Sequence, residues 1–473
     1  MKDYARSRAW CEWTDFDTWR GRALRALDDP LAPATPPFHL LSLPGITAAQ
    51  QRQCAERWML ARLRDSAPSR ALLAIEFAAN PAADRPHQPI RIGYLSSDFH
   101  QHATSLLMVE MLEAHDRDHF TLHAYSSGAD DGLGMRQRLC ARFDSFTDIR
   151  AMDDMQAARA IHADGIDILV DLKGFTAGSR TELLTYRPAP VQVSFLGYPG
   201  TVGGDFCDYL ISDSFVIPAG ASADYSESVA RLPDSYQPHG RQARPGVGPS
   251  RSTVGLPEQG LVFCCFNQAF KFTPAVFDVW CALLDRTAGS VLWLLHDDRA
   301  EGNLRREAMG RGIRPDRLVF APDRPQAEHL ARLSLADLVL DTLPYNAHTT
   351  ASDALWVGVP VLTCAGDTFA ARVAGSLLRA VGLSELITHS LEDYADLALS
   401  LAGDPARLAG LRRRLLAQRM SAPLFDVPRY TASLEALFRG MWHRHRNGLA
   451  PAAMGAVGTA LPYLDSFARS LRL

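Results

Sequence analysis

The stretch LADLVLDTLPYNAHTTASDALWVGVPVLT (Leu335–Thr363) holds a strand, a helix and a second strand in close succession. Leu338–Asp341 and Val361–Thr363 are short apolar runs typical of buried strands, and Ala351–Val357 between them has helical spacing. Strands joined through a helix pair in parallel, because a parallel pair needs a long crossover connection. The stretch therefore predicts one unit of an α/β fold with a parallel sheet.

The same alternation of strand and helix occupies most of the chain, in two blocks. The strands expected in the first block are Ile90–Leu95, Phe120–Tyr125, Ile166–Asp171, Val191–Phe195 and Tyr209–Ser212. Those expected in the second are Leu261–Phe266, Val291–Leu295, Leu318–Ala321, Leu338–Asp341 and Val361–Thr363. We expect an α/β protein of two doubly wound, Rossmann-like lobes facing a cleft, with ligands beyond the carboxyl ends of the strands.

Changes in composition mark the expected domain boundaries. An N-terminal helical segment (1–85) ends in the proline-containing spacer Asn80–Pro89, and the first lobe follows (86–231). A stretch rich in Pro, Gly, Ser and Arg (232–260) is expected to be a linker. The second lobe (261–440) and a C-terminal tail with a helix (441–473) complete the chain.

Composition limits the function classes. Of the 473 residues, 47% are hydrophobic and 22% charged, and the net charge is -4, which gives no electrostatic case for a nucleic-acid partner. We expect no membrane span, because no apolar run approaches about 18 residues. The eight cysteines are scattered without a CxxC pair, which favours buried thiols in a reducing cytoplasm over a zinc site or a disulfide scaffold.

Several familiar motifs are missing. The sequence contains no GxGxxG after the first strand of either block, no GxxxxGK[ST], no GxSxG and no HExxH. DxD pairs, which bind metal in many sugar transferases, occur at Asp15–Asp17 and Asp116–Asp118, where surface carboxylates are expected. We therefore expect neither a metal nor another cofactor.

Two polar junctions begin the blocks. In SSDFHQHATS, His102 precedes Thr104 just after the first strand, either as a loop or helix-start residue or as a catalytic group. In FNQAFKFTP, Thr273 and Pro274 form a good helix start, so Gln268 and Lys271 lie at a helix N-terminus. A lysine there could compensate phosphate charge without a metal, or could be solvated.

Two further junctions follow strands of the second block. His329 and Arg332 are three residues apart and share a helical face, which could hold a base or be polar surface. Thr350 and Asp353 resemble a capping box, which leaves His348 and Thr349 free to meet an anion at the same helix N-terminus. Three polar junctions in one lobe predict a nucleotide-diphosphate site.

Five ordered motifs resemble the catalytic region of the O-GlcNAc transferase and SPINDLY family. They are IRIGYLSSDFHQHATS, RPAPVQVSFLGYPGT, FNQAFK, AEHLARLSLADLVLDT and HTTASDALWVGVPVLT. With CEWTDFD ahead of them, the resemblance covers roughly Cys11 to Gly440. It implies a GT-B, metal-independent, inverting glycosyltransferase that uses UDP-GlcNAc and modifies Ser or Thr of proteins.

The resemblance also implies residue roles. His102 matches a proposed general base, and Lys271 matches the lysine that stabilises the leaving diphosphate, with Gln268 beside it. Matches to the uracil-binding segment are Arg324, Pro325, Gln326, His329 and Arg332. Matches to diphosphate and ribose contacts are His348, Thr349, Thr350 and Asp353. Matches near the sugar or acceptor are Leu196, Gly197 and Thr104.

Departures from the family keep alternatives open. Tetratricopeptide repeats precede CEWTDFD in the family, whereas ten residues precede it here, so acceptor choice stays open. The domain inserted between the lobes of animal members is replaced by the 232–260 linker. Gln326 replaces a lysine and Ala103 a proline of those members. A SPINDLY-like O-fucosyltransferase, a glucosyltransferase and a catalytically silent nucleotide-sugar-binding protein remain alternatives.

Overall fold

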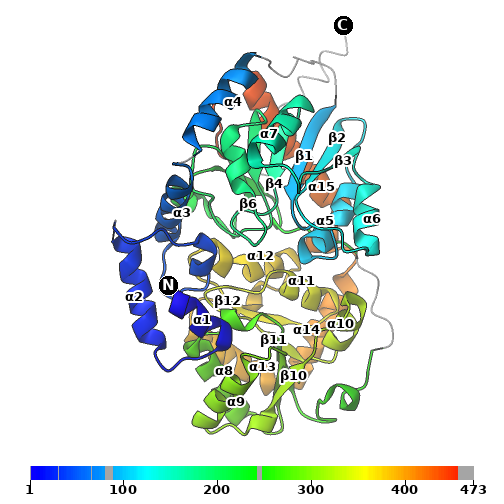
Figure 1. The fold of residues 1–473 in the computed structure, drawn as a ribbon. Helices are drawn as coiled ribbons and strands as arrows, with labels where there is room; N and C mark the ends of the chain where they lie inside the picture. The colour runs from blue at the N-terminus through cyan, green and yellow to red at the C-terminus, as the bar shows by residue number, and fades with distance from the viewer. Residues whose placement is uncertain (1, 30, 65, 80–88, 242–247, 456–473) are drawn as a thin grey trace.

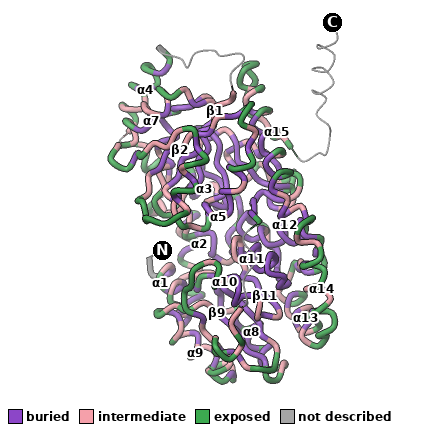
Figure 2. The backbone as a smooth tube through the Cα atoms, turned by 90° about the vertical axis from the view of Figure 1, so that its right-hand side faces the viewer, coloured by how far each residue is buried: buried purple, intermediate pink, exposed green. Residues whose placement is uncertain are grey.

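The computed structural model describes residues 2–29, 31–64, 66–79, 89–241 and 248–455, which form two lobes stacked one on the other (Figure 1). Most of the expected spacer at Asn80–Pro89 lies outside these residues, as does part of the expected linker. Buried backbone fills the centre of both lobes and continues between them around α11 (Thr349–Trp356) (Figure 2).

The first lobe contains an eight-stranded parallel sheet in the order β14-β7-β6-β5-β4-β1-β2-β3. Its strands are β1 (Ile90–Ser96), β2 (Phe120–Ser126), β3 (Ser145–Asp148), β4 (Ile168–Asp171), β5 (Val191–Ser194), β6 (Tyr209–Asp213), β7 (Ser228–Leu232) and β14 (Met454–Gly455). The helices between the strands are α5 (Ala103–Glu113), α6 (Gly134–Cys140) and α7 (Asp154–Ala163). Strand β4 is buried along its whole length, as expected for a sheet covered on both faces.

The second lobe contains a six-stranded parallel sheet in the order β10-β9-β8-β11-β12-β13. Its strands are β8 (Val262–Cys265), β9 (Val291–Leu295), β10 (Leu318–Ala321), β11 (Leu338–Leu340), β12 (Val361–Cys364) and β13 (Ile387–Thr388). Its helices are α8 (Pro274–Arg286), α9 (Glu301–Gly310), α10 (Gln326–Leu333), α11, α12 (Val373–Ala380), α13 (Leu391–Ala402) and α14 (Pro405–Gln418).

Short 3-10 helices join elements in all parts of the described chain. They are η1 (Pro37–Leu40), η2 (Thr181–Tyr186), η3 (Ala219–Asp224), η4 (Ser252–Val254), η5 (Ala269–Lys271), η6 (Pro315–Arg317), η7 (Phe369–Ala371), η8 (Ser384–Leu386) and η9 (Pro423–Phe425).

The segments at both ends of the described chain run from one lobe to the other. The N-terminal helices are α1 (Lys2–Trp10), α2 (Phe16–Asp28), α3 (Ala48–Arg62) and α4 (Ala67–Ala79). Helix α1 packs on η5 of the second lobe, whereas α4 packs on α7 of the first. At the other end, α15 (Val427–Arg446) leaves the second lobe and packs on α5, β5 and β7, and β14 then joins the first sheet. By its packing, α15 belongs to the first lobe, although most of it precedes residue 440.

The expected arrangement of two doubly wound lobes is confirmed. Every strand expected from the sequence is present, with ends shifted by at most two residues. The sequence does not predict strands β3, β7, β13 and β14, because they lie at or near sheet edges and lack a continuous apolar run. Seven of the eight cysteines are buried and all eight are free thiols, as expected.

Candidate active site between the two lobes

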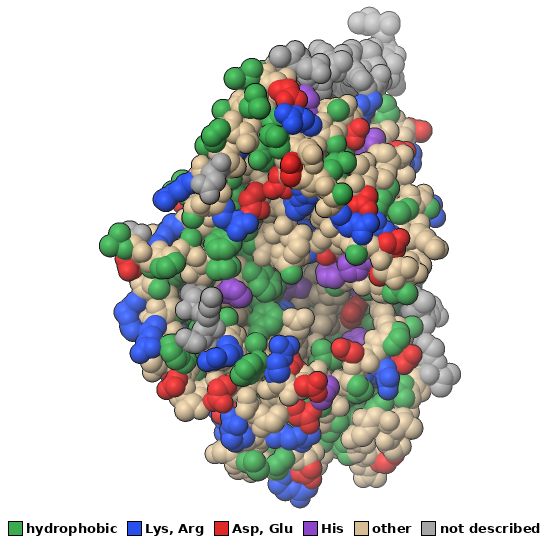
Figure 3. Space-filling model, viewed as in Figure 1, with side chains coloured by type: hydrophobic (Ala, Val, Ile, Leu, Met, Phe, Trp, Pro, Cys, Tyr) green, Lys and Arg blue, Asp and Glu red, His purple; other side chains and the backbone are tan. Residues whose placement is uncertain are grey.

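The molecule is hollowed between the lobes, and histidine side chains lie around the hollow (Figure 3). The loops with predicted site residues follow β1 and β5 in the first lobe and β8, β10 and β11 in the second. All are carboxyl ends of parallel strands, where α/β sheets bind ligands.

A buried carboxylate, Asp341, organises the second-lobe half of the site. Its Oδ1 accepts the backbone N–H groups of Thr342 (2.7 Å) and Ala347 (2.5 Å), and its Oδ2 accepts the Thr363 hydroxyl (2.6 Å). Burial raises the pKa of Asp341 to about 6, so the group is ionised at neutral pH. These bonds fold the loop after β11 onto the strand end and fix where α11 begins.

Lys271 closes the 3-10 turn η5 after β8. Its Nζ donates to the carbonyl oxygen of Asn346 (2.8 Å) and lies 3.8 Å from the centre of the Tyr345 ring. Burial lowers the pKa of Lys271 to about 8, while the Asp341 carboxylate opposes this shift. The ammonium is therefore charged at neutral pH and stands beside the loop that leads into α11.

Helix α11 begins at Thr349 with His348 as its N-cap residue. The expected capping box between Thr350 and Asp353 is wrong. The helix starts two residues earlier than a Thr350 cap requires, and the Thr350 hydroxyl donates to Oδ1 of Asn267 (2.6 Å). Burial lowers the pKa of His348 well below its usual value, so its ring is neutral beside Lys271.

The predicted pair on α10 consists of a half-buried residue, His329, and a buried residue, Arg332. The His329 ring lies 5.2 Å from the Phe266 ring and lines a small cavity with Asn267 and Thr350. Arg332 is 3% exposed, and its guanidinium contacts the Pro322 carbonyl and the His329 Nδ1 (3.1 Å). Arg332 thus holds the His329 ring through this contact and is itself buried, instead of sharing an exposed helical face with it.

The remaining predicted residues on α10 and α11 differ in exposure. Arg324 and Pro325 are exposed just before α10, and Gln326 is half-buried at its first position. Asp353 is buried on α11, and its Oδ1 lies 3.5 Å from Nε2 of His239, a buried residue of the expected linker. Gln268 is exposed at the start of η5.

In the first lobe, His102 is the N-cap residue of α5. Its Nδ1 accepts the Thr104 N–H (3.2 Å) and lies 3.3 Å from Oδ2 of Asp98. Lys173 Nζ is buried and donates to both oxygens of Asp98 at 2.7 Å. Burial lowers the pKa of His102, Asp98 opposes this and Lys173 adds to it. The ring is therefore neutral at pH 7 and 42% exposed.

The tautomer of His102 bears on its chemistry. While Nδ1 accepts the Thr104 N–H, a neutral ring carries its proton on Nε2. To accept a proton at Nε2, the ring must carry its own proton on Nδ1. In that tautomer the Nδ1–H group can donate a hydrogen bond to Asp98 Oδ2. Thr104 is buried, and its hydroxyl also points to Asp98 Oδ2 (3.4 Å).

The loop after β5 comes very close to the end of β4. A Cβ on Gly197 would lie 2.0 Å from the Leu172 carbonyl oxygen, so no larger residue fits there. Leu196 before it has φ of 69°, in the left-handed region that non-glycine residues seldom adopt. The tight turn packs these two residues against the neighbouring strand end.

An aromatic cluster joins three parts of the chain next to Lys271. Tyr198 of the first lobe and Tyr345 of the second pack with Leu41 of the N-terminal segment. The Phe38 and Phe270 rings lie 6.0 Å apart, and Phe270 lies 6.0 Å from Tyr345. The cluster therefore holds both lobes and the N-terminal segment together at the site.

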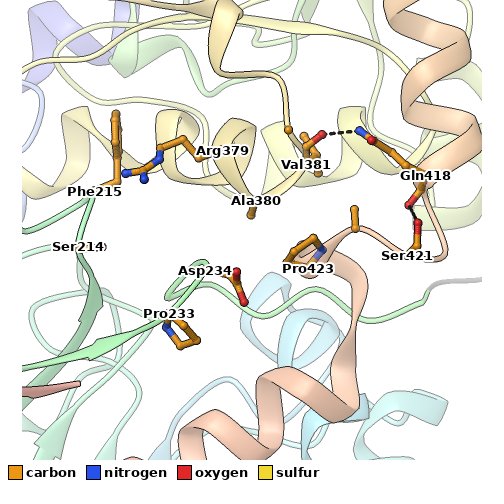
Figure 4. A pocket seen from close by; sticks show the side chains of 12 residues that line it. Ser214, Phe215, Pro233, Asp234, Arg379, Ala380, Val381, Gln418, Ser421 and Pro423 are labelled. Carbon is orange, nitrogen blue, oxygen red and sulfur yellow. Dashed lines mark hydrogen bonds between the residues drawn. The ribbon is translucent and has the colours of Figure 1, made fainter. Parts of the chain in front are cut away.

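A separate cavity of about 350 Å³ lies between the lobes, lined by none of the predicted site residues (Figure 4). Phe215 of the first lobe, Asp234 of the expected linker, and Arg379 and Gln418 of the second lobe contribute to it. Among the described residues, no group of three or more His, Cys, Asp or Glu side chains is arranged to hold a metal ion. Over the same residues, no helix has both the length and the apolar character needed to cross a membrane.

Sequence reasoning missed four polar residues that hold the predicted ones. Asp98 and Lys173 hold His102, whereas Asp341 and Asn267 hold the start of α11. One signal was available, because Asp341 directly follows a buried apolar strand. A carboxylate at that place is expensive unless it is hydrogen-bonded, which indicates a structural or catalytic use.

Comparison with known proteins gives one family. The model of glycosyl transferase family 41 matches residues 10–244 and 239–434. A probable UDP-N-acetylglucosamine–peptide N-acetylglucosaminyltransferase, SEC of Arabidopsis thaliana, is 36% identical over 93% of this chain and 46% of its own length. A probable enzyme of the same name, SPINDLY of rice (Oryza sativa subsp. japonica), is 34% identical over 79% of this chain and 41% of its own.

Among solved structures, a lysine-to-methionine mutant of the Thermobaculum terrenum O-GlcNAc transferase is similar to this chain. The TM-score is 0.78 at 31% identity, over 93% of this chain and 83% of that one. In contrast, this chain spans about half the length of the curated relatives it matches.

Proposed function

The chain belongs to glycosyl transferase family 41, and on that premise we propose that it transfers N-acetylglucosamine from UDP-GlcNAc to Ser or Thr hydroxyls of proteins, with inversion. The observation that carries the proposal is the Lys271 ammonium bound to the loop that leads into α11 in the second lobe, together with His102 at the start of α5 in the first lobe. The fold is GT-B, as in the similar Thermobaculum enzyme.

The second lobe would receive the nucleotide. The backbone N–H groups at the start of α11 and the positive end of its dipole favour an anion. The Lys271 ammonium lies beside them, so both could offset the charge that grows on the departing diphosphate. His329, next to the Phe266 ring, offers a flat face for the uracil.

The first lobe would receive the acceptor. A Ser or Thr hydroxyl would attack the anomeric carbon from the side opposite the diphosphate, which inverts the configuration. His102 is neutral and partly exposed, so it could accept the hydroxyl proton in the tautomer that places Nδ1–H toward Asp98. The free, mostly buried thiols support a reducing, cytoplasmic location within the same proposal.

Donor identity can be tested with a panel of UDP-GlcNAc, UDP-glucose and GDP-fucose, using a Ser/Thr peptide library as acceptor. We expect transfer from UDP-GlcNAc, unaffected by EDTA, because lysine and helix N–H groups take the place of a metal. Transfer from GDP-fucose or UDP-glucose instead would identify one of the two alternative donors. UDP binding without any turnover would identify a silent nucleotide-sugar-binding protein, and loss of transfer in EDTA would contradict the metal-free mechanism.

A further inference from the structure

Helix α1 delivers a buried arginine to the turn that carries Lys271. Arg8 is 1% exposed, and its Nε donates to the Phe270 carbonyl oxygen (2.9 Å), to which its Nη2 also donates. Cys11 lies next to the same turn, with Sγ 3.5 Å from the Ala269 carbonyl oxygen. Two consecutive carbonyls of η5 thus face the N-terminal segment.

These contacts restrain the backbone on either side of the Lys271 peptide bond and so limit where its side chain begins. The Phe270 carbonyl belongs to the peptide bond that leads into Lys271. The hydrogen bonds from Arg8 therefore restrain the orientation of that peptide group. The Lys271 N–H donates to the Gln268 carbonyl (3.0 Å), and its Nζ donates to the Asn346 carbonyl (2.8 Å). Lysine has four flexible side-chain bonds, so a fixed backbone is needed to hold its ammonium at one point.

A buried arginine such as Arg8 is energetically unfavourable if its only role is to stabilise the N-terminal segment. A buried guanidinium loses its hydration, and here two of its donors go to one neutral carbonyl oxygen. Its Nη1 has no hydrogen-bond partner among the described residues. Other contacts already anchor this segment to the second lobe, since Asn303 donates to the Trp10 carbonyl (2.8 Å) and Arg306 pairs with Glu12.

We infer that Arg8 is a positioning residue for Lys271: it fixes the η5 backbone so that the ammonium stays at the start of α11. The inference rests on the proposed function for the role of Lys271, whereas the structural coupling of Arg8 to the turn does not. It predicts that changes at the N-terminal segment alter turnover without altering nucleotide binding.

The test compares Arg8→Met, Arg8→Lys and Lys271→Met in single-turnover transfer and UDP titration. Arg8→Met should lower kcat by about 10- to 100-fold, as misplacement of a catalytic group does, with the Kd for UDP within about threefold. Arg8→Lys keeps one donor and should recover part of the loss. If Arg8 acts through Lys271, adding Arg8→Met to Lys271→Met causes no further loss of kcat.

Asn303→Ala is the matched control, because it removes an anchor of the same segment that does not touch η5; its kcat should stay near the wild-type value. Amide hydrogen exchange of peptides covering 266–273 gives a readout independent of turnover. Arg8→Met should speed exchange there, and Asn303→Ala should not. Unchanged exchange, or additive losses in the double variant, would overturn the inference. A wild-type protein that transfers no sugar would refute the proposed function, while hydrogen exchange would still decide the role of Arg8.

Discussion

At the scale of single residues, the second-lobe part of the site contains ionisable groups that are held away from water. Lys271 and Asp341 illustrate this, because burial lowers the pKa of the lysine to about 8 and raises that of the aspartate to about 6. Both nevertheless remain charged at pH 7. The lysine thus offers a full positive charge in a region of low polarity, where it acts more strongly on a phosphate than it would in water.

Replacing Lys271 by methionine should separate binding from chemistry. The charge on the diphosphate increases as it leaves, so Lys271→Met should lower kcat by about 10²- to 10³-fold and weaken UDP binding less than tenfold. Single-turnover transfer and UDP titration measure the two effects. A variant that binds UDP far more weakly yet turns over normally when saturated would contradict a transition-state role.

The pH dependence of kcat/KM should be bell-shaped. Because burial lowers the pKa of His102, its acid limb lies below the usual value near 6.5, and activity rises as the ring loses its proton. The alkaline limb lies near the Lys271 pKa of about 8, and activity falls as the ammonium loses its proton. His102→Ala should lose the acid limb and about 10²- to 10⁴-fold of the rate, with UDP affinity intact. An acid limb that survives in this variant would make His102 a positioning residue.

At the scale of elements, helix starts are placed by neighbouring strand ends. Thr350 on α11 donates to Asn267 after β8, and the Asp341 carboxylate after β11 receives the Ala347 N–H. Within α10, the Arg332 guanidinium holds the His329 ring by a contact with its Nδ1 atom. The start of α11 therefore depends on side chains that follow two strands, β8 and β11, which fixes its position relative to the sheet.

His329→Ala should weaken UDP binding by about 1–2 kcal/mol, because stacking of a base on an aromatic ring contributes about 1–3 kcal/mol. His329→Phe keeps a flat ring and should retain most of the affinity. Glu328→Ala changes the exposed neighbour on the same helix and serves as the control. Calorimetry with UDP measures all three, and unchanged affinity in His329→Ala would place the ring outside the nucleotide site.

At the scale of the whole molecule, buried contacts away from the predicted site residues hold the lobes together. Asp213 at the end of β6 accepts the Ser376 hydroxyl of α12 (2.6 Å) and the Tyr236 N–H (2.9 Å) with the same oxygen. The linker also contacts the second lobe, since Gln237 donates to Ser352 on α11 (3.0 Å). The relative position of the lobes is thus tied to α12 through Asp213 and to α11 through Gln237.

Ser376→Ala should lower stability by about 1–3 kcal/mol, because the buried Asp213 carboxyl group loses a hydrogen-bond donor. Thermal and urea unfolding measure the change. Ser433→Ala removes a serine whose hydroxyl bonds the backbone of its own helix near the surface, and it should stay within about 0.5 kcal/mol of wild type. Equal effects of the two substitutions would show that the lobe contact contributes nothing specific.

The sequence by itself determined the two sheets, most of their strands and the loops that carry the predicted site. Apolar runs such as Val291–Leu295 and helix signals such as Thr273 before Pro274 are local, and local patterns are encoded in consecutive residues. Only the tertiary structure decided which groups support the site. Asp98 with Lys173, Asn267 with Thr350 and Arg8 with Phe270 are far apart in sequence, and their meeting depends on how strands and lobes pack. No local pattern records such contacts, because their energy comes from burial and hydrogen bonds formed once the whole chain is folded.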